Sequence, residues 1–244
     1  MSENRVIGVV PGCGGAGATV FAAVLAWCAG ETCRADPDSG VRKARRGRVF
    51  LLDCDPMGGG IDVLLGCEQV PGPRWGQVLL GGGRLDPSVL VDGLPRWRRV
   101  SFLAADSAAE QEPGALCQVI EAAAGAGTVV LDLPRWPSAA RAAALELCDR
   151  VLLVTPAEVK AVTASALVAA HLDPEVSGVA VRGSCRALPA SRVGALLGLA
   201  VIGQLPYDRA SLHPTGLGGR KLRRATRRVA LSALRLPADP RTAA

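Results

Sequence analysis

The 244-residue sequence has few of the side chains that commonly bind metals. Its two histidines, His171 and His213, stand alone, and its eight cysteines include no C-x-x-C pair. This pattern argues against a zinc cage or a paired redox site, and neither histidine is expected to be a ligand or a catalyst. The cysteines are interpreted as small buried hydrophobic residues of a reducing compartment.

Long apolar runs are also missing. No run reaches the roughly 18 residues that span a bilayer, although 49% of the residues are hydrophobic. The first five residues do not show the charged-then-apolar layout of a signal peptide. We therefore expect a cytoplasmic protein. A chain of this length is sufficient for one domain with a substantial core.

Short apolar runs alternate with helical patterns, and the runs are continuous, which is typical of strands covered on both faces. Strands are expected at 5–10, 48–52, 99–104, 128–131, 150–154, 177–181 and 200–204. Helices are expected near 18–29, 109–124, 138–148, 158–171, 188–198 and 216–235. The alternation predicts an α/β fold, a doubly wound and mostly parallel sheet of about seven strands with helices on both faces.

Two segments break this alternation. Residues 30–47 are polar and carry five Lys/Arg, and we interpret them as a flexible basic insertion on the surface, with a basic contact loop as the alternative. Residues 70–98 are rich in Gly, Pro and Arg and are expected to form short helices over one end of the sheet.

A glycine-rich turn lies between the first expected strand and the first expected helix. Glycines allow successive N–H groups to converge, and the helix N-terminus behind them adds positive potential, so the turn predicts a phosphate-binding loop. The spacing from Gly12 fits the P-loop pattern G-x-x-x-x-G-K-[ST], but Ala18 occupies the lysine position. The expected nucleotide-binding residues of this loop are Gly12, Cys13, Gly14, Gly15, Ala16, Gly17, Ala18 and Thr19.

Acidic residues follow two expected strands. Asp53 and Asp55 end the second strand, and Asp132 ends the fourth. Ligands of open α/β sheets bind beyond the carboxyl ends of the strands. A hydroxyl from Thr19 and these carboxylates would suit a Mg²⁺ ion that keeps several waters and binds phosphate oxygens.

The order of the Gly-rich loop, D-x-D-P-x-G-G-G and strand-D-x-P resembles the MinD/ParA family of deviant Walker A ATPases. The segments GGAGAT, LLDCDPMGGGIDVLLG, VVLDLPR and IGQLPYDR resemble in particular the CpaE-like and septum-site-determining subgroup from actinobacterial secretion loci. The resemblance covers residues 5–236. It implies one MinD/ParA-like nucleotide-binding domain, with a basic C-terminal helix at 216–236 and a tail at 237–244.

The resemblance implies a role for each matching residue. Gly14, Gly15, Gly17 and Thr19 would bind the phosphates of ATP or ADP. Thr19 and Asp132 would hold Mg²⁺, the latter through water. Asp55 would orient the attacking water as the catalytic residue, and Asp53 would support its loop.

The chain departs from the family at three positions. The family's signature lysine falls on Cys13, its P-loop lysine falls on Ala18, and its adenine-contacting Asn has no match in residues 181–184. Losing two charged hydrogen bonds would cost about 3–6 kcal/mol, or two to four decades in affinity. We therefore expect weak or absent ATP hydrolysis, unless Arg135, Arg182 or a partner supplies the charge.

A different reading takes Gly12-x-Gly14-x-x-Gly17 as the dinucleotide fingerprint of an NAD(P)-binding reductase, a weak signal alone. Asp53 would then bind the ribose, although it lies 36 residues beyond Gly17. This reading leaves Asp55 and Asp132 without a role.

The net charge of +6 is concentrated at one end. Residues 209–244 contain nine Lys/Arg and one acid, and the rest of the chain is slightly acidic. Leu222, Ala225, Val229, Ala233 and Leu236 form an apolar stripe at helical spacing. The segment predicts a closing helix with a basic face, which could remain solvated or contact an anionic membrane or DNA phosphates. The resemblance further implies protein partners in division or secretion machinery and a nucleotide-linked homodimer.

Overall fold

The computed structural model describes residues 5–32, 47–78, 89, 92–106, 111–207, 217 and 224–236. One sheet of eight strands forms its centre, in the order β3-β4-β2-β5-β1-β6-β7-β8. All neighbours pair in parallel except β3 and β4. The strands are β1 Val6–Pro11, β2 Arg48–Asp53, β3 Arg96–Trp97, β4 Val100–Leu103, β5 Gly127–Asp132, β6 Arg150–Pro156, β7 Ser177–Arg182 and β8 Ala200–Leu205.

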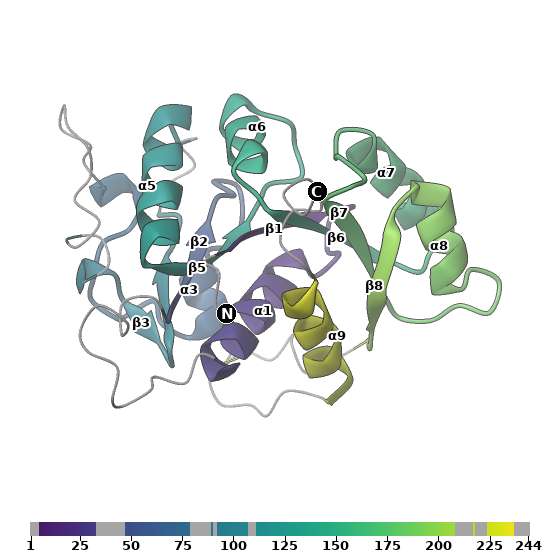
Figure 1. Cartoon of the computed structure of the whole chain (residues 1–244), viewed down its shortest axis with the longest axis horizontal. Coiled ribbons are helices and arrows are strands. Elements are labelled where there is room, and N and C mark those ends of the chain that lie inside the picture. Colours follow the sequence, from purple (N-terminus) through teal and green to yellow (C-terminus); the bar gives the residue numbers. More distant parts are fainter. Residues whose placement is uncertain are drawn as a thin grey trace.

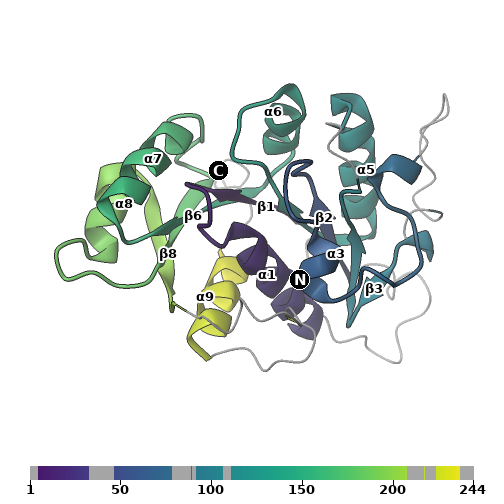
Figure 2. The ribbon, with the colours of Figure 1, turned by 180° about the vertical axis from the view of Figure 1, so that it is seen from behind.

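Helices cover both faces of the sheet (Figure 1). One face carries α5 (Pro113–Ala126), α6 (Ala139–Glu146), α7 (Val159–Ala169) and α8 (Ala190–Leu197). The other carries α1 (Ala18–Thr32), α3 (Ile61–Leu65) and α9 (Arg224–Arg235), with α1 and α9 side by side in both views (Figure 2). The expected doubly wound α/β fold is confirmed.

The strands divide the core into two layers because successive side chains point to opposite faces. On β2, Phe50 and Leu52 belong to the core layer on the side of α5–α8, whereas Val49 and Leu51 belong to the layer on the side of α1. All four are at most 1% exposed. A strand buried on both sides must be apolar at every position, which explains the continuous runs in the sequence.

The seven expected strands are all present, with ends shifted by at most two residues. The eighth strand, β3, was not predicted, since two antiparallel residues carry no readable periodicity. Within its described residues, the segment 70–98 contains this strand, one turn of 3₁₀ helix, η1 (Trp75–Gln77), and helical residues at positions 89, 92 and 93. The expectation of short helices there is therefore only partly right.

Two expected helices have different bounds, α5 at its start and α1 at its end. α5 begins at Pro113 rather than near 109, because the Glu112 carboxylate caps it by accepting hydrogen bonds from Gly114 and Ala115 N–H groups. α1 extends to Thr32, so the first three residues of the expected insertion 30–47 are helical. Residues 33–46 of that insertion lie outside the described part.

The C-terminal basic helix is present as α9, from Arg224. Residues 218–223, including Leu222, and the tail 237–244 lie outside the described residues. Val229 and Ala233 of the expected stripe are buried, but Ala225 is exposed and Ala230 is buried instead. The buried residues pack against α1 and β8, so the apolar face of α9 is used within the domain.

Four cysteines are buried as expected, whereas Cys13 and Cys117 are half-buried and Cys185 is exposed. The seven cysteines in the described ranges are all free thiols; Cys33 lies outside them. No helix in these ranges combines the length and the apolar composition that a bilayer crossing requires.

Strand β8 contains an irregularity. Val179 of β7 pairs with Val201, but the next residue, Ala180, pairs with Gly203. Ile202 is thus an extra residue, which makes a β-bulge.

Candidate nucleotide-binding site

The floor of the glycine-rich loop is packed against β6 and α7. Gly12 donates its N–H to the carbonyl of Val154 at 2.9 Å. A Cβ atom at Gly12 would overlap the Ser165 hydroxyl and lie 2.8 Å from Ser165 Cβ. Ser165 itself is fully buried and donates to Thr155 Oγ1 at 2.7 Å. Only glycine fits here, and the packing fixes where the loop begins.

The rim of the loop is open. A Cβ atom at Gly14 or Gly15 would meet no heavy atom within 4 Å. Gly15 and Gly17 have φ of +69° and +87°, a conformation that favours glycine. The loop leads directly into α1, whose first turn carries no acid. Free space, left-handed glycines and a helix N-terminus are the features that let backbone N–H groups approach a phosphate.

The two positions where the sequence lacks the family's lysines are apolar in the structure. Ala18 is 3% exposed and belongs to the core under α1. Cys13 is half-buried; burial raises the pKa of its thiol, and the nearby guanidinium groups of Arg135 and Arg182 act in the opposite direction. The loop therefore carries no charge of its own, but two arginines lie close enough to affect Cys13 electrostatically.

Thr19 and Asp132 come together at the base of the loop. The Thr19 hydroxyl hydrogen-bonds to the Asp132 carboxylate, which joins the first turn of α1 to the end of β5. Asp132 is 3% exposed, and burial, with a contribution from the Asp53 charge, raises its pKa well above the ordinary value. No cation is paired with Asp132 within the described ranges, so this edge of the sheet carries buried acidic groups without a compensating charge.

Asp53 lies beside Asp132, since the two residues are register partners on β2 and β5. Its carboxylate accepts N–H groups of Asp55, Ile61 and Ala105 at 3.1–3.3 Å. Burial raises the pKa of Asp53 to about 6 despite these bonds. Its backbone carbonyl accepts the indole N–H of Trp75. Asp53 thus connects β2 with the loop that follows it and with the segment after β4.

Asp55 is half-buried and caps its own turn. Its Oδ1 accepts the Met57 N–H at 3.0 Å, and its carbonyl accepts the Gly58 N–H at 3.1 Å. Met57 is 76% exposed at the tip of this turn. No group of three or more His, Cys, Asp or Glu in the described part of the chain is arranged to hold a metal by itself. A cation here would need ligands from water or from a bound phosphate.

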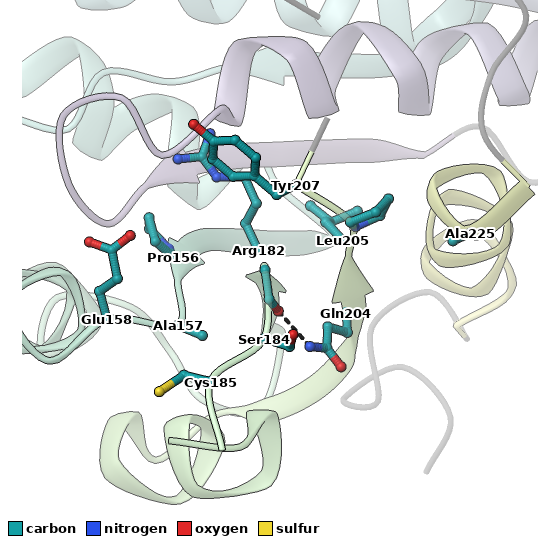
Figure 3. A pocket seen from close by; sticks show the side chains of 12 residues that line it. Pro156, Ala157, Glu158, Arg182, Ser184, Cys185, Gln204, Leu205, Tyr207 and Ala225 are labelled. Atoms are coloured by element: carbon teal, nitrogen blue, oxygen red, sulfur yellow. Dashed lines mark hydrogen bonds between the residues drawn. The ribbon is translucent and has the colours of Figure 1, made fainter. Parts of the chain in front are cut away.

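A cavity of about 740 Å³ opens beside the loop, at the carboxyl ends of β6, β7 and β8 (Figure 3). Residues 156–158, 182–185 and 204–207 line it, together with Ala225 of α9. Its volume lies within the range of small-molecule sites. The sequence motifs did not indicate this cavity. The sequence feature that could have indicated it is that the three lining segments lie at the ends of apolar strands.

Arg182 connects the cavity with the glycine-rich loop. Its Nη1 lies 3.1 Å from the position that a Cβ atom on Gly17 would take. Its Cζ lies 5.5 Å from the centre of the Tyr207 ring, and Figure 3 shows the side chain rising from β7 to this ring. Sequence reasoning named Arg182 as a substitute cation without being able to place it.

The same fold occurs in solved structures of ParA and MinD proteins. A ParA family ATPase from Chlorobium tepidum TLS superimposes with a TM-score of 0.76, covering 96% of this chain and 99% of the other at 17% identity. The MinC:MinD cell division protein complex of Aquifex aeolicus gives 0.73, with 95% of each chain covered at 20% identity. The septum site-determining protein MinD complexed with Mg-ADP from Pyrococcus horikoshii OT3 gives 0.65, with 93% and 94% covered at 19% identity.

Two proteins from Mycobacterium tuberculosis, the uncharacterized proteins MT3760 and Rv3660c, are 37% identical to this chain over 238 residues. The match covers 95% of this chain but 62% of each relative. No protein-family model matches the sequence.

Proposed function

We propose that this chain is a MinD/ParA-like regulatory protein that binds ATP or ADP at a degenerate P-loop and hydrolyses ATP weakly or not at all. The observation that carries the proposal is the open glycine loop backed by the Thr19–Asp132 contact, in a loop without lysine. The neighbouring cavity offers room for a nucleoside next to the loop. The solved MinD with Mg-ADP supports nucleotide binding in this fold.

The donor set fits magnesium. Thr19 and Asp132 offer hard oxygen ligands, and a divalent cation would favour the ionised forms of Asp53 and Asp132, which burial disfavours. Magnesium bound there would neutralise charge on the phosphate oxygens. Thr19 and Asp132 would hold it together with waters, and Asp55 would orient a water for attack.

Weak turnover follows from the lost lysines. Phosphoryl transfer depends mainly on positioning and on stabilising charge. Cys13 and Ala18 supply no positive charge where the phosphates would lie. The loss affects the transition state more than the bound nucleotide, so binding should survive better than hydrolysis.

The biological role we propose is septum-site placement or localisation of a pilus or secretion system, as in CpaE-like proteins, by contact with other proteins. The MinC:MinD complex supports a protein partner for this fold. A nucleotide-linked homodimer would be one binding state. We place the protein in the cytoplasm, with a peripheral position at the inner membrane face or on DNA through α9. Because its apolar residues pack inside the domain, α9 would act through its exposed Arg224, Arg227 and Arg228.

The test is a calorimetric titration with ATP, ADP, NAD and NADP, each with and without Mg²⁺, followed by turnover assays. Magnesium-dependent binding of ATP or ADP is expected, and Thr19→Ala should weaken it. Thr163→Ala is the matched control, because Thr163 is an exposed helical threonine on α7. Absence of binding to any nucleotide would overturn the proposal and leave a structural adaptor.

Two other functions make different predictions in the same titration. A working ATPase with a substitute cation is favoured by the position of Arg182 on Gly17, and turnover stimulated by a partner or by lipid would support it. An NAD(P)-binding reductase needs Asp53 for the ribose, but that carboxylate is 2% exposed and already accepts three N–H groups. Preferential binding of NAD(P) would support the reductase.

A further inference from the structure

The glycine-rich loop has room for a phosphate but no positive charge of its own. Any positive charge near a bound phosphate must therefore come from neighbouring cationic side chains. Arg135 and Arg182 are the two arginines that act on Cys13 at the loop. Arg135 stacks on the exposed Trp136, with its Cζ 4.8 Å from the ring centre. Arg182 instead lies directly against Gly17. This difference singles out Arg182.

The backbone of Arg182 is held from both sides. As the last residue of β7 it pairs with Pro156 on β6 and with Leu205 on β8. Its carbonyl accepts the Ala157 N–H at 2.9 Å, and the following residue, Gly183, donates to Leu205 at 2.8 Å. Because the backbone of Arg182 is fixed by strands on both sides, the direction in which its side chain leaves the sheet is fixed as well.

The guanidinium group of Arg182 is packed against an aromatic ring but pairs with no carboxylate of the described residues. Tyr207 stacks against it from one side. Its Nε is buried without a hydrogen-bond partner, and it makes no ion pair with any described residue. Leaving a buried donor of a charged group unsatisfied costs free energy. An anion at the loop would offer the hydrogen bonds that the protein does not.

We propose that Arg182 binds the phosphate oxygens of a nucleotide seated on the loop at residues 12–19 and takes the place of the missing lysine. A guanidinium suits this task because its planar donors can bind two phosphate oxygens at once. Tyr207 is a positioning residue that holds the group over Gly17. The inference rests on the proposed function, since it presupposes that the loop binds a nucleotide.

The experiment compares calorimetric affinities of wild type, Arg182→Ala, Arg182→Gln and Arg182→Lys for MgADP and for inorganic pyrophosphate. Loss of one charged hydrogen bond should weaken both ligands about 10- to 100-fold in the Ala and Gln variants. The Lys variant keeps the charge but not the planar fork, so it should lose less. Pyrophosphate reports on the phosphate contact alone because it has no nucleoside for the cavity.

Arg192→Ala is the matched control, since it removes the same charge from an exposed position on α8. Its affinities should stay within about twofold of wild type, as expected of a distant surface change. A second pair tests the support: Tyr207→Leu should weaken binding, and Tyr207→Phe, which keeps the ring, should restore it. Thermal unfolding of every variant identifies any that fail to fold. If Arg182→Ala does not fold, Arg182→Gln and Arg182→Lys still test the proposal, because they keep most of the volume of the side chain.

Several outcomes would overturn the inference. Wild-type affinity in Arg182→Ala would show that Arg182 is not a ligand-binding residue, and tighter binding would show that it blocks the loop. Weaker MgADP binding with unchanged pyrophosphate binding would place its contact on the nucleoside. If wild type bound neither ligand, the proposed function itself would fail, which is a result distinct from these three.

Discussion

The acidic and the cationic halves of the candidate site are built differently. Asp53 and Asp132 are buried, paired in register and hydrogen-bonded to backbone or to Thr19. Arg182 is half-buried and lacks a partner for its Nε. The acids organise the ends of the strands and so contribute to folding as well as to a site. By our proposal the cation serves ligand binding, and it lies on a different strand, β7, from the two acids.

The largest expected effect tests the acidic half by pH. The pKa of Asp53 rises from an ordinary 3.8 to about 6 because of burial. The unfolded chain therefore ionises first as the pH rises, and the folded state loses stability between these two values. The loss is on the order of 3 kcal/mol. The unfolding free energy of wild type minus that of Asp53→Asn should fall by most of this amount from pH 4 to pH 7, since the unfolded carboxyl is already partly ionised at pH 4.

This experiment is done by urea unfolding without nucleotide or metal. Taking the difference between the two proteins removes the contributions of the carboxylates that do not interact with Asp53, whereas the coupled Asp132 remains part of the signal. A difference that stays constant, or that grows with pH, would show that Asp53 is ionised in the folded state over the whole range.

The second prediction contrasts the floor and the rim of the loop. Gly12→Ala should destabilise the protein by about 2 kcal/mol, because the new methyl group overlaps Ser165. Gly14→Ala is its matched control and should change stability by less than about 0.5 kcal/mol, since nothing lies within 4 Å. Equal effects in chemical denaturation would contradict the packing described for the floor.

The third prediction restores the cationic half. Ala18→Lys, alone or with Cys13→Lys, should raise MgATP affinity about tenfold, the worth of one modest charged hydrogen bond. Ala18→Met is the control for length without charge. If calorimetry finds no gain in either lysine variant, the loop is not a decayed P-loop and has another use.

The smallest effect concerns charge far from the loop. Arg228→Gln removes an exposed arginine of α9, and both the unfolding free energy and the MgADP affinity should change little, by under about 0.5 kcal/mol. The same variant should bind anionic vesicles or DNA more weakly if α9 contacts either one. A large loss of MgADP affinity would mean that long-range charge, rather than Arg182, attracts the phosphates.

The sequence predicted the parts that depend on local pattern. The strands 48–52 and 128–131 are recognisable because burial on both faces demands apolar residues throughout. The observed β2 is longer by one residue at its end, and β5 by one residue at each end. Asp53 and Asp132 could be placed at one edge because parallel strands end together. The start of α5 could not be predicted, since it depends on a single capping residue, Glu112. The strand β3 could not be predicted either, since it consists of only two paired residues.

The reach of a long side chain was beyond sequence reasoning. Arg182 and Gly17 are far apart in the chain, and their contact depends on the order of the strands and on Tyr207. The stripe on α9 was shifted for a related reason: α1 and β8 decide which side of that helix is buried, and they cover Ala230 rather than Ala225.

The bulge in β8 determines where the end of that strand points. Ile202 and Gly203 both face the layer of α1 and α9, since Ile202 packs there and a Cβ at Gly203 would lie 2.8 Å from Val229. Leu205 returns to that same layer two residues after Gly203. A regular ladder would turn Leu205 towards α8 and swing the following Pro206 and Tyr207 away from Arg182. One extra residue in an edge strand thus determines the direction of the Tyr207 ring. Deletion of Ile202 would remove the contact between Tyr207 and Arg182 while leaving every residue of the glycine-rich loop in place.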